Sequence, residues 1–102
     1  EMENIQQRAD SRAFLDAGAS CVFVPGLLDE PTVTALVQGI GERRVSVINV
    51  PGSLPQARLA ELGVARVSFG PWTQRATLTY LADLAADLYA GGALPDGARP
   101  LN

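Results

Sequence analysis

The feature of this sequence that most limits its possible folds is a pattern that occurs three times. A short run of apolar and β-branched residues ends at a turn signal of proline and glycine, and a longer segment with helical spacing of apolar residues follows. The three runs are Cys21–Val24, Val45–Val50 and Ala65–Phe69. Runs this short predict β-strands, and the segments around them predict helices.

The predicted helices follow from apolar residues spaced three and four apart, together with residues that suit helix ends. Proline is expected in the first turn of the second helix, where its missing N–H costs nothing. The helices are expected over residues 4–17, from Asp29 as N-cap to residue 40, from Ser53 as N-cap to Gly63, and over Thr73–Tyr89.

This alternation of helices and strands predicts an α/β fold with three parallel strands. Strands joined by helices of this length run parallel, and their crossovers are right-handed. The strands are almost entirely apolar, so both faces of the sheet are expected to be buried. Three parallel strands leave two open edges, and we therefore expect the chain to be part of a larger structure.

The composition excludes several classes of function. The net charge is −3, and the charges are spread along the chain, which argues against a nucleic-acid partner. All eight basic residues are arginine, so no lysine or histidine can act as a base, a Schiff-base amine or a metal ligand within this segment. A single cysteine, Cys21, excludes an internal disulfide and a cysteine-rich zinc site.

Membrane and targeting signals are not found in the sequence. No apolar run approaches the roughly 20 residues that a membrane-spanning helix needs. The first residues, Glu1-Met2-Glu3-Asn4, do not resemble a signal peptide. The apolar fraction of 47% is typical of a packed globular chain, and a cytoplasmic location is expected.

Three ordered blocks carry a resemblance to a known family. They are Asp16–Leu27, Val47–Gly52 and Leu59–Pro71, and the segment Glu61–Ser68 is the most specific part. Together they resemble the isocitrate lyase/phosphoenolpyruvate mutase family over about residues 5–92, in its phosphonomutase-like and methylisocitrate lyase-like branch. The resemblance implies that residues 1–92 are strands six to eight of a (β/α)₈ TIM barrel with their helices, followed by a tail over residues 93–102.

The resemblance also implies an activity for the parent protein. It would be a lyase or phosphonomutase that cleaves or rearranges a C–C or P–C bond next to a 2-oxo acid, with a small carboxylate or phosphonate substrate. In the family, Mg²⁺ stabilises the enolate of a pyruvate-like fragment. The metal ligands and a loop of Lys-Lys-Cys-Gly-His type lie on earlier strands. The segment is therefore expected to contain no catalytic or metal-binding residue and to be inactive alone.

Barrel active sites lie at the carboxyl ends of the strands. The substrate-binding candidates are therefore Asn49, Pro25, Gly26, Ser68 and Gly70. The family places a substrate-contacting asparagine at the position of Asn49, although a local role in capping the next turn explains this residue equally well. Methylisocitrate lyase-like members carry a glutamate at the position of Pro25, so proline here favours the phosphonomutase-like branch.

Three other features have structural explanations. Arg66 is expected near the bottom of the barrel in an ion pair, because guanidinium groups that enter cores are paired. Cys21 is expected to act as a small hydrophobic residue of a strand. The Gly39-x-Gly41 sequence follows a helix instead of a strand, so it does not indicate a dinucleotide site.

The leucine-rich helix expected over Thr73–Tyr89 suits docking onto a second subunit, because the family often exchanges its final helices between subunits. The same stripe also suits packing onto its own barrel. A homo-oligomer is the expected assembly. The alternative function is a non-catalytic α/β assembly or binding module, and the coding sequence upstream would distinguish the two.

Overall fold

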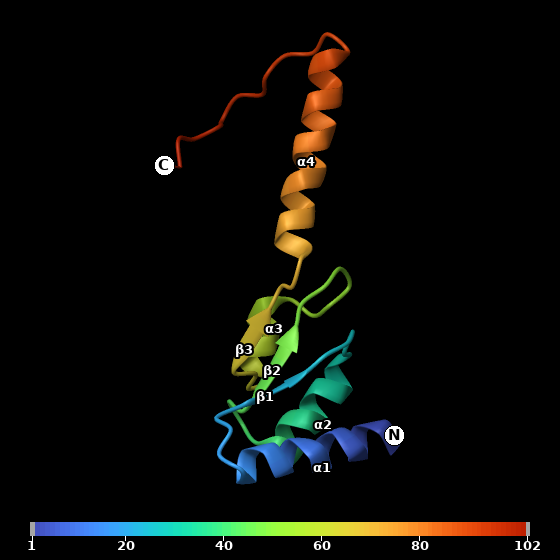
Figure 1. Cartoon of the computed structure of the whole chain (residues 1–102), viewed down its shortest axis with the longest axis vertical. Coiled ribbons are helices and arrows are strands. Elements are labelled where there is room, and N and C mark those ends of the chain that lie inside the picture. The colour runs from blue at the N-terminus through green and yellow to red at the C-terminus, as the bar shows by residue number, and fades with distance from the viewer. Residues whose placement is uncertain (1, 102) are drawn as a thin grey trace. The chain divides into compact units, whose positions relative to one another are not determined.

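The structure is a computed structural model that describes residues 2–101, with side chains from residue 5. The chain forms two compact units, residues 1–70 and residues 71–102. The predicted alternation of helices and strands is confirmed (Figure 1). The elements are α1 (Met2–Asp16), β1 (Val22–Val24), α2 (Glu30–Ile40), β2 (Val45–Ile48), α3 (Gln56–Glu61), β3 (Arg66–Ser68) and α4 (Trp72–Tyr89).

The three strands form one parallel sheet in the order β1-β2-β3. Val22 lies opposite Val45, and Ser46 lies opposite Arg66. Each strand is thus the spatial neighbour of the next strand in the chain, which is the arrangement of consecutive strands in a (β/α)₈ barrel. The strands are one or two residues shorter than predicted at their ends.

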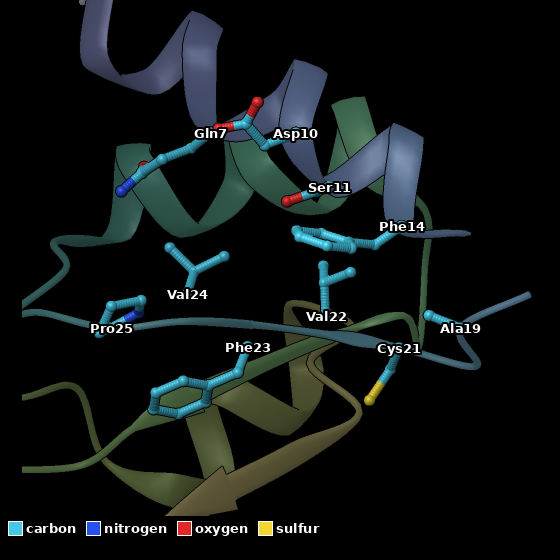
Figure 2. Close-up of a pocket in the computed structure, with 10 residues that line it drawn as sticks. All are labelled: Gln7, Asp10, Ser11, Phe14, Ala19, Cys21, Val22, Phe23, Val24 and Pro25. Atoms are coloured by element: carbon cyan, nitrogen blue, oxygen red, sulfur yellow. The ribbon is translucent and has the colours of Figure 1, made fainter. Parts of the chain in front are cut away.

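One face of the sheet is covered by helices. Alternate strand residues point to opposite faces, and Val22 and Val24 point toward α1 and α2, whereas Cys21 and Phe23 point the other way (Figure 2). The buried cluster on the covered face consists of Val22, Val24, Val33, Leu36, Val37, Ile40, Val45, Val47, Leu59 and Val64. Helices on a single face are typical of a barrel, since a doubly wound sheet has helices on both faces.

The other face, which carries Phe23, Ser46, Arg66 and Ser68, is called the open face below. The side chain of Phe23 is 51% exposed, and Arg66 and Ser68 are also exposed. The prediction that both faces are buried was therefore wrong for this chain, because no described element covers the open face. Exposed aromatic surface of this kind is characteristic of a surface that contacts further protein.

The ends of α2 and α3 show how local chemistry positions the helices. The Asp29 side chain accepts a hydrogen bond from the Thr32 N–H at 2.9 Å, which confirms the predicted N-cap and lowers the pKa of Asp29. Ser53 does not cap α3, because this helix begins at Gln56, after Pro55. The Ser53 Oγ accepts the Val50 N–H at 2.9 Å instead, so the prediction of a serine cap was wrong.

An ion pair joins α3 to the start of α2. The Arg58 guanidinium donates to both carboxylate oxygens of Glu30, with Nε to Oε2 at 3.0 Å, and it also pairs with Glu61 at 2.9 Å. Hydrogen bonding from Arg58 lowers the pKa of Glu30, and the two carboxylates raise the pKa of Arg58. A two-point contact of this kind fixes the orientation of one helix against the other.

The second unit consists of α4 and the segment that follows it. Residues 93–101 contain no helix or strand. No residue of α4 is fully buried, and Leu78, Tyr80 and Leu81 are each more than half exposed. None of the helices in residues 2–101 combines the length and the apolar composition that crossing a membrane requires.

Candidate functional site

All the predicted substrate-binding residues lie where the strands end. Pro25 and Gly26 follow β1, Asn49 follows β2, Ser68 is the last residue of β3, and Gly70 lies two residues further on. Because the strands are parallel, these positions share one edge of the sheet, called the carboxyl edge below. This edge carries the active site in barrel enzymes.

Asn49 and Ser68 are joined across neighbouring strands. The Asn49 backbone N–H donates to the Ser68 carbonyl oxygen at 2.7 Å, and the Asn49 Nδ2 donates to the Leu54 carbonyl oxygen at 3.3 Å. The Asn49 side chain is half-buried, and its Oδ1 has no partner among the described residues. The bond to Leu54 holds the amide plane, and an acceptor oxygen and one N–H stay available for a ligand.

The loop after Asn49 is closed by Ser53. The Ser53 hydroxyl accepts the Val50 N–H, and the Ser53 N–H donates to the Val50 carbonyl oxygen, both at 2.9 Å. Gly52 in this loop has a φ of +93°, a conformation that favours glycine. The loop therefore places the Leu54 carbonyl oxygen against Asn49. Sequence reasoning missed this role of Ser53, although serine next to Pro-Gly is a known turn signal.

Ser68 and Gly70 form a tight turn at the end of β3. The Gly70 N–H donates to the Ser68 Oγ at 3.2 Å, so the hydroxyl hydrogen of Ser68 can still be donated. Gly70 has a φ of +54°, and a Cβ at this position would lie 3.2 Å from the Ile48 Cδ1. Glycine therefore allows the backbone to approach β2 closely.

Pro25 and Gly26 are not joined to this group by any hydrogen bond that the structure describes. Pro25 instead lines a pocket of about 440 Å³ between α1 and β1 (Figure 2). Gly26 has a φ of +108°, and no atom lies within 4 Å of a Cβ built there, so its backbone conformation explains the glycine. The structure thus brings Asn49, Ser68 and Gly70 together and leaves Pro25 and Gly26 at the neighbouring strand.

A polar cluster lies on the open face. The Arg66 Nε donates to the Ser46 Oγ and the Arg66 Nη2 donates to the Cys21 Sγ, both at 3.3 Å, and this sulfur lies 3.1 Å from the Ser46 Oγ. Ser46 is only 4% exposed. The predicted ion pair of Arg66 was wrong for the described residues, because no carboxylate on the open face reaches the guanidinium. Cys21 is a hydrogen-bonding partner as well as a packing group.

The described residues do not form a complete metal site. No group of three or more aspartate, glutamate, histidine or cysteine side chains is close enough to hold an ion within the described part of the chain. Asp29 and Glu30 follow β1 by a few residues. The Asp29 carboxylate accepts the Thr32 N–H, and the Glu30 carboxylate is paired with Arg58.

The comparisons with known proteins agree with this geometry. The family model of phosphoenolpyruvate phosphomutase matches residues 2–89. The chain is 36% identical to a candidate phosphonomutase from Burkholderia cenocepacia J2315, with a TM-score of 0.73 over 84% of this chain and 35% of that one. A candidate lyase/mutase from the same organism is 30% identical, with a TM-score of 0.73 over 88% of this chain and 33% of that one.

Two curated relatives are also similar. The uncharacterised Mycobacterium tuberculosis proteins MT2054 (strain CDC 1551 / Oshkosh) and Rv1998c (strain ATCC 25618 / H37Rv) are each 38% identical over 93% of this chain. The chain spans about a third of the length of these relatives, 36% in both cases. The family match covers most of the chain, and it agrees with the parallel sheet and the single helical layer. This chain belongs to the phosphoenolpyruvate phosphomutase family.

Proposed function

We propose that this chain supplies strands six to eight, with their helices, of a Mg²⁺-dependent lyase or phosphonomutase. The parent barrel would cleave or rearrange a C–C or P–C bond next to a 2-oxo acid. The observation that carries the proposal is the one-sided sheet of the first unit, in which α1, α2 and α3 cover one face while the open face and the carboxyl edge carry polar groups. The relatives are about three times as long as this chain, which supports the proposal that the chain is one part of a larger barrel.

In this proposal Asn49 and Ser68 bind the substrate. The free Oδ1 and N–H of Asn49 and the Ser68 hydroxyl can donate to and accept from a small carboxylate or phosphonate. Each of the two side chains is held by one hydrogen bond with a backbone group, the Asn49 amide by the Leu54 carbonyl oxygen and the Ser68 hydroxyl by the Gly70 N–H, so less side-chain entropy is lost on binding. Because Gly70 has no Cβ to meet the Ile48 side chain, the turn after Ser68 can pack closely against β2.

The metal belongs to a part of the barrel that this chain does not contain. A bound Mg²⁺ would supply electrostatic stabilisation of the enolate. The described residues offer neither a cluster of ligands nor a free carboxylate beside Asn49. We therefore propose that this chain contributes substrate contacts and part of the lining of the active site, and that it is inactive by itself.

The test is an assay of the barrel that contains this chain, with Mg²⁺, against phosphonopyruvate, methylisocitrate and oxaloacetate. We expect turnover of one of the three by the complete barrel. The 102-residue chain, measured in parallel at the same concentration, should give no rate above the uncatalysed reaction. A folded complete barrel that turns over none of the substrates would contradict the proposal.

A non-catalytic assembly role is the second candidate, and α4 is the observation that favours it. Leu78, Leu81 and Leu88 lie at helical spacing, and their side chains are 52%, 57% and 37% exposed. We propose that this stripe mediates homo-oligomerisation, which is compatible with either function. Apolar side chains at such spacing are the usual contact in helix pairs.

Light scattering after size-exclusion chromatography tests the oligomer. The chain is expected to elute as a dimer or a larger assembly, and the double variant Leu78→Gln/Leu81→Gln is expected to shift it to the monomer. Thr79→Gln, which adds the same side chain outside the stripe, serves as the matched control and should leave the mass unchanged. A monomeric wild-type chain at all concentrations would exclude this contact.

A further inference from the structure

The carbonyl oxygen that holds the Asn49 side chain lies two residues before α3. The Asn49 Nδ2 donates to the Leu54 carbonyl oxygen at 3.3 Å, and α3 begins at Gln56. The peptide bond between Leu54 and Pro55 is planar, and the Pro55 carbonyl oxygen accepts the Arg58 N–H at 3.0 Å in the first turn of the helix. The direction of the Leu54 carbonyl group therefore depends on the position of α3.

The sequence of α3 does little to hold this helix in place. The helix is six residues long, and no side chain caps its first turn. A helix of this length is unstable by itself, because fixing the first turn costs more free energy than its few hydrogen bonds contribute. Leu59 is the buried residue of α3, and one buried side chain anchors a helix without setting its direction. A further contact is therefore needed to fix α3.

The ion pair between Arg58 and Glu30 makes this contact. The Arg58 Nε donates to the Glu30 Oε2 at 3.0 Å, and the Arg58 Nη2 donates to the Glu30 Oε1. Two bonds from one planar guanidinium fix an orientation as well as a distance. Glu30 is the first residue of α2, a helix whose buried side chains are Val33, Leu36, Val37 and Ile40. The weakly held α3 is thus tied to the firmly packed α2.

A pocket of about 380 Å³ separates the loop after β1 from the loop after β2. Its lining includes Leu28 and Glu30 on one side and Gly52 and Leu54 on the other. Side chains that line a pocket have no packing partner across it, so packing between the two loops does not set their separation. Glu30 lines this pocket and pairs with Arg58, so the ion pair is a direct link between the two sides.

We propose that Glu30 and Arg58 are positioning residues of the substrate site, which orient the side-chain amide of Asn49 by fixing α3. The inference rests on the proposed function, in which Asn49 binds the substrate. Both side chains of the ion pair are 41% exposed, and exposed ion pairs add little to the free energy of unfolding. The main effect of breaking the pair is therefore expected at Asn49 and not in the stability of the first unit.

The kinetic test uses two variants of the complete barrel that each remove one carboxylate from Arg58. Glu30→Gln removes the charged link between the helices, whereas Glu61→Gln removes the partner that lies in α3 itself. Glu30→Gln is expected to lower kcat/KM by about tenfold, mainly by raising KM, because a displaced amide binds the substrate less well. Glu61→Gln is the matched control, and it should change kcat/KM by less than about twofold.

Arg58→Lys tests the geometry of the pair separately from its charge. Lysine keeps the positive charge but has no planar fork, so it cannot reproduce the two-point contact with Glu30. This variant also leaves the sequence of α2 unchanged, which excludes an effect of the Glu30 charge on the N-terminus of that helix. We expect the same rise in KM as for Glu30→Gln. If Glu30→Gln does not fold, Arg58→Lys decides the test alone.

A double-mutant cycle shows whether the ion pair acts through Asn49. If it does, adding Glu30→Gln to Asn49→Ala should lower kcat/KM by less than about twofold further, since the amide is already absent. A further loss of about tenfold would mean that the pair acts on another part of the site. That result would overturn the proposal.

A measurement without substrate separates this inference from the proposed function. The side chains of asparagine are labelled with ¹⁵N in the complete barrel, and the Asn49 amide signal is identified by its loss in Asn49→Ala. Glu30→Gln and Arg58→Lys are expected to shift or broaden this NMR signal, and Glu61→Gln is expected to leave it unchanged. These changes in a barrel that turns over none of the substrates would contradict the proposed function and keep the link from Glu30 to Asn49. An unchanged Asn49 signal in both test variants would overturn the inference, whatever the activity.

Discussion

Replacing Leu36 with alanine is expected to lower the free energy of unfolding of the first unit by about 2–5 kcal/mol. Leu36 is 1% exposed, and it belongs to the cluster that joins α2 to the covered face of the sheet. Alanine would leave a cavity, since the neighbouring strands are held by their backbone bonds and cannot close around it. Urea titration followed by far-UV circular dichroism measures the effect.

The matched control for this prediction is Leu94→Ala, in the segment that follows α4. It deletes the same atoms from a side chain that is 72% exposed, so a change within about 0.5 kcal/mol is expected. Equal losses in the two variants would contradict the assignment of Leu36 to the core. Such a result would mean that α2 does not pack on the sheet in solution.

The second large effect is expected at Asn49. In the complete barrel, Asn49→Ala should lower kcat/KM by about 10²–10³, the cost of removing one positioned hydrogen-bonding group from an active site. This prediction rests on the proposed function. The measurement is steady-state kinetics with whichever of phosphonopyruvate, methylisocitrate and oxaloacetate proves to be the substrate, alongside the unfolding midpoint of each variant.

Ser53→Ala separates substrate binding by Asn49 from a purely local role. It removes the hydrogen bond that closes the loop but keeps the amide of Asn49. We expect Ser53→Ala to lower stability by about 1 kcal/mol, the net value of one hydrogen bond, and to reduce kcat/KM by less than about tenfold. If Asn49→Ala loses stability and keeps its kcat/KM, the amide serves only to hold Leu54, and the substrate role is wrong.

Much of the candidate site could be placed from the sequence. Asn49 and Ser68 were expected at strand ends because they lie late in apolar runs, Gly70 because it directly follows one, and parallel strands align their carboxyl ends. The cap at Asp29 was also predictable, since a cap depends on residues that are neighbours in the chain. The roles of these site residues in binding remain predictions.

Other features of the site depend on contacts that the sequence does not show. The bonds from Arg66 to Ser46 and Cys21 join residues 20 and 45 positions apart. They require the register that places Ser46 opposite Arg66. The expectation of an ion pair for Arg66 was wrong for the described residues. A guanidinium needs hydrogen-bond acceptors, but the sequence does not show which acceptors lie on the neighbouring strands.

The sequence by itself determined the order of the elements, the parallel direction of the strands and the family. The order and the direction of the strands depend on the spacing of apolar residues and on turn signals, which act over a few neighbouring positions. The family rests on the resemblance carried by the three ordered blocks. Only the tertiary structure decided that one face of the sheet stays open, that Ser53 closes the loop beside Asn49, and that Arg58 pairs with Glu30. These arrangements arise from packing and register between segments distant in the chain, and no local pattern encodes that geometry.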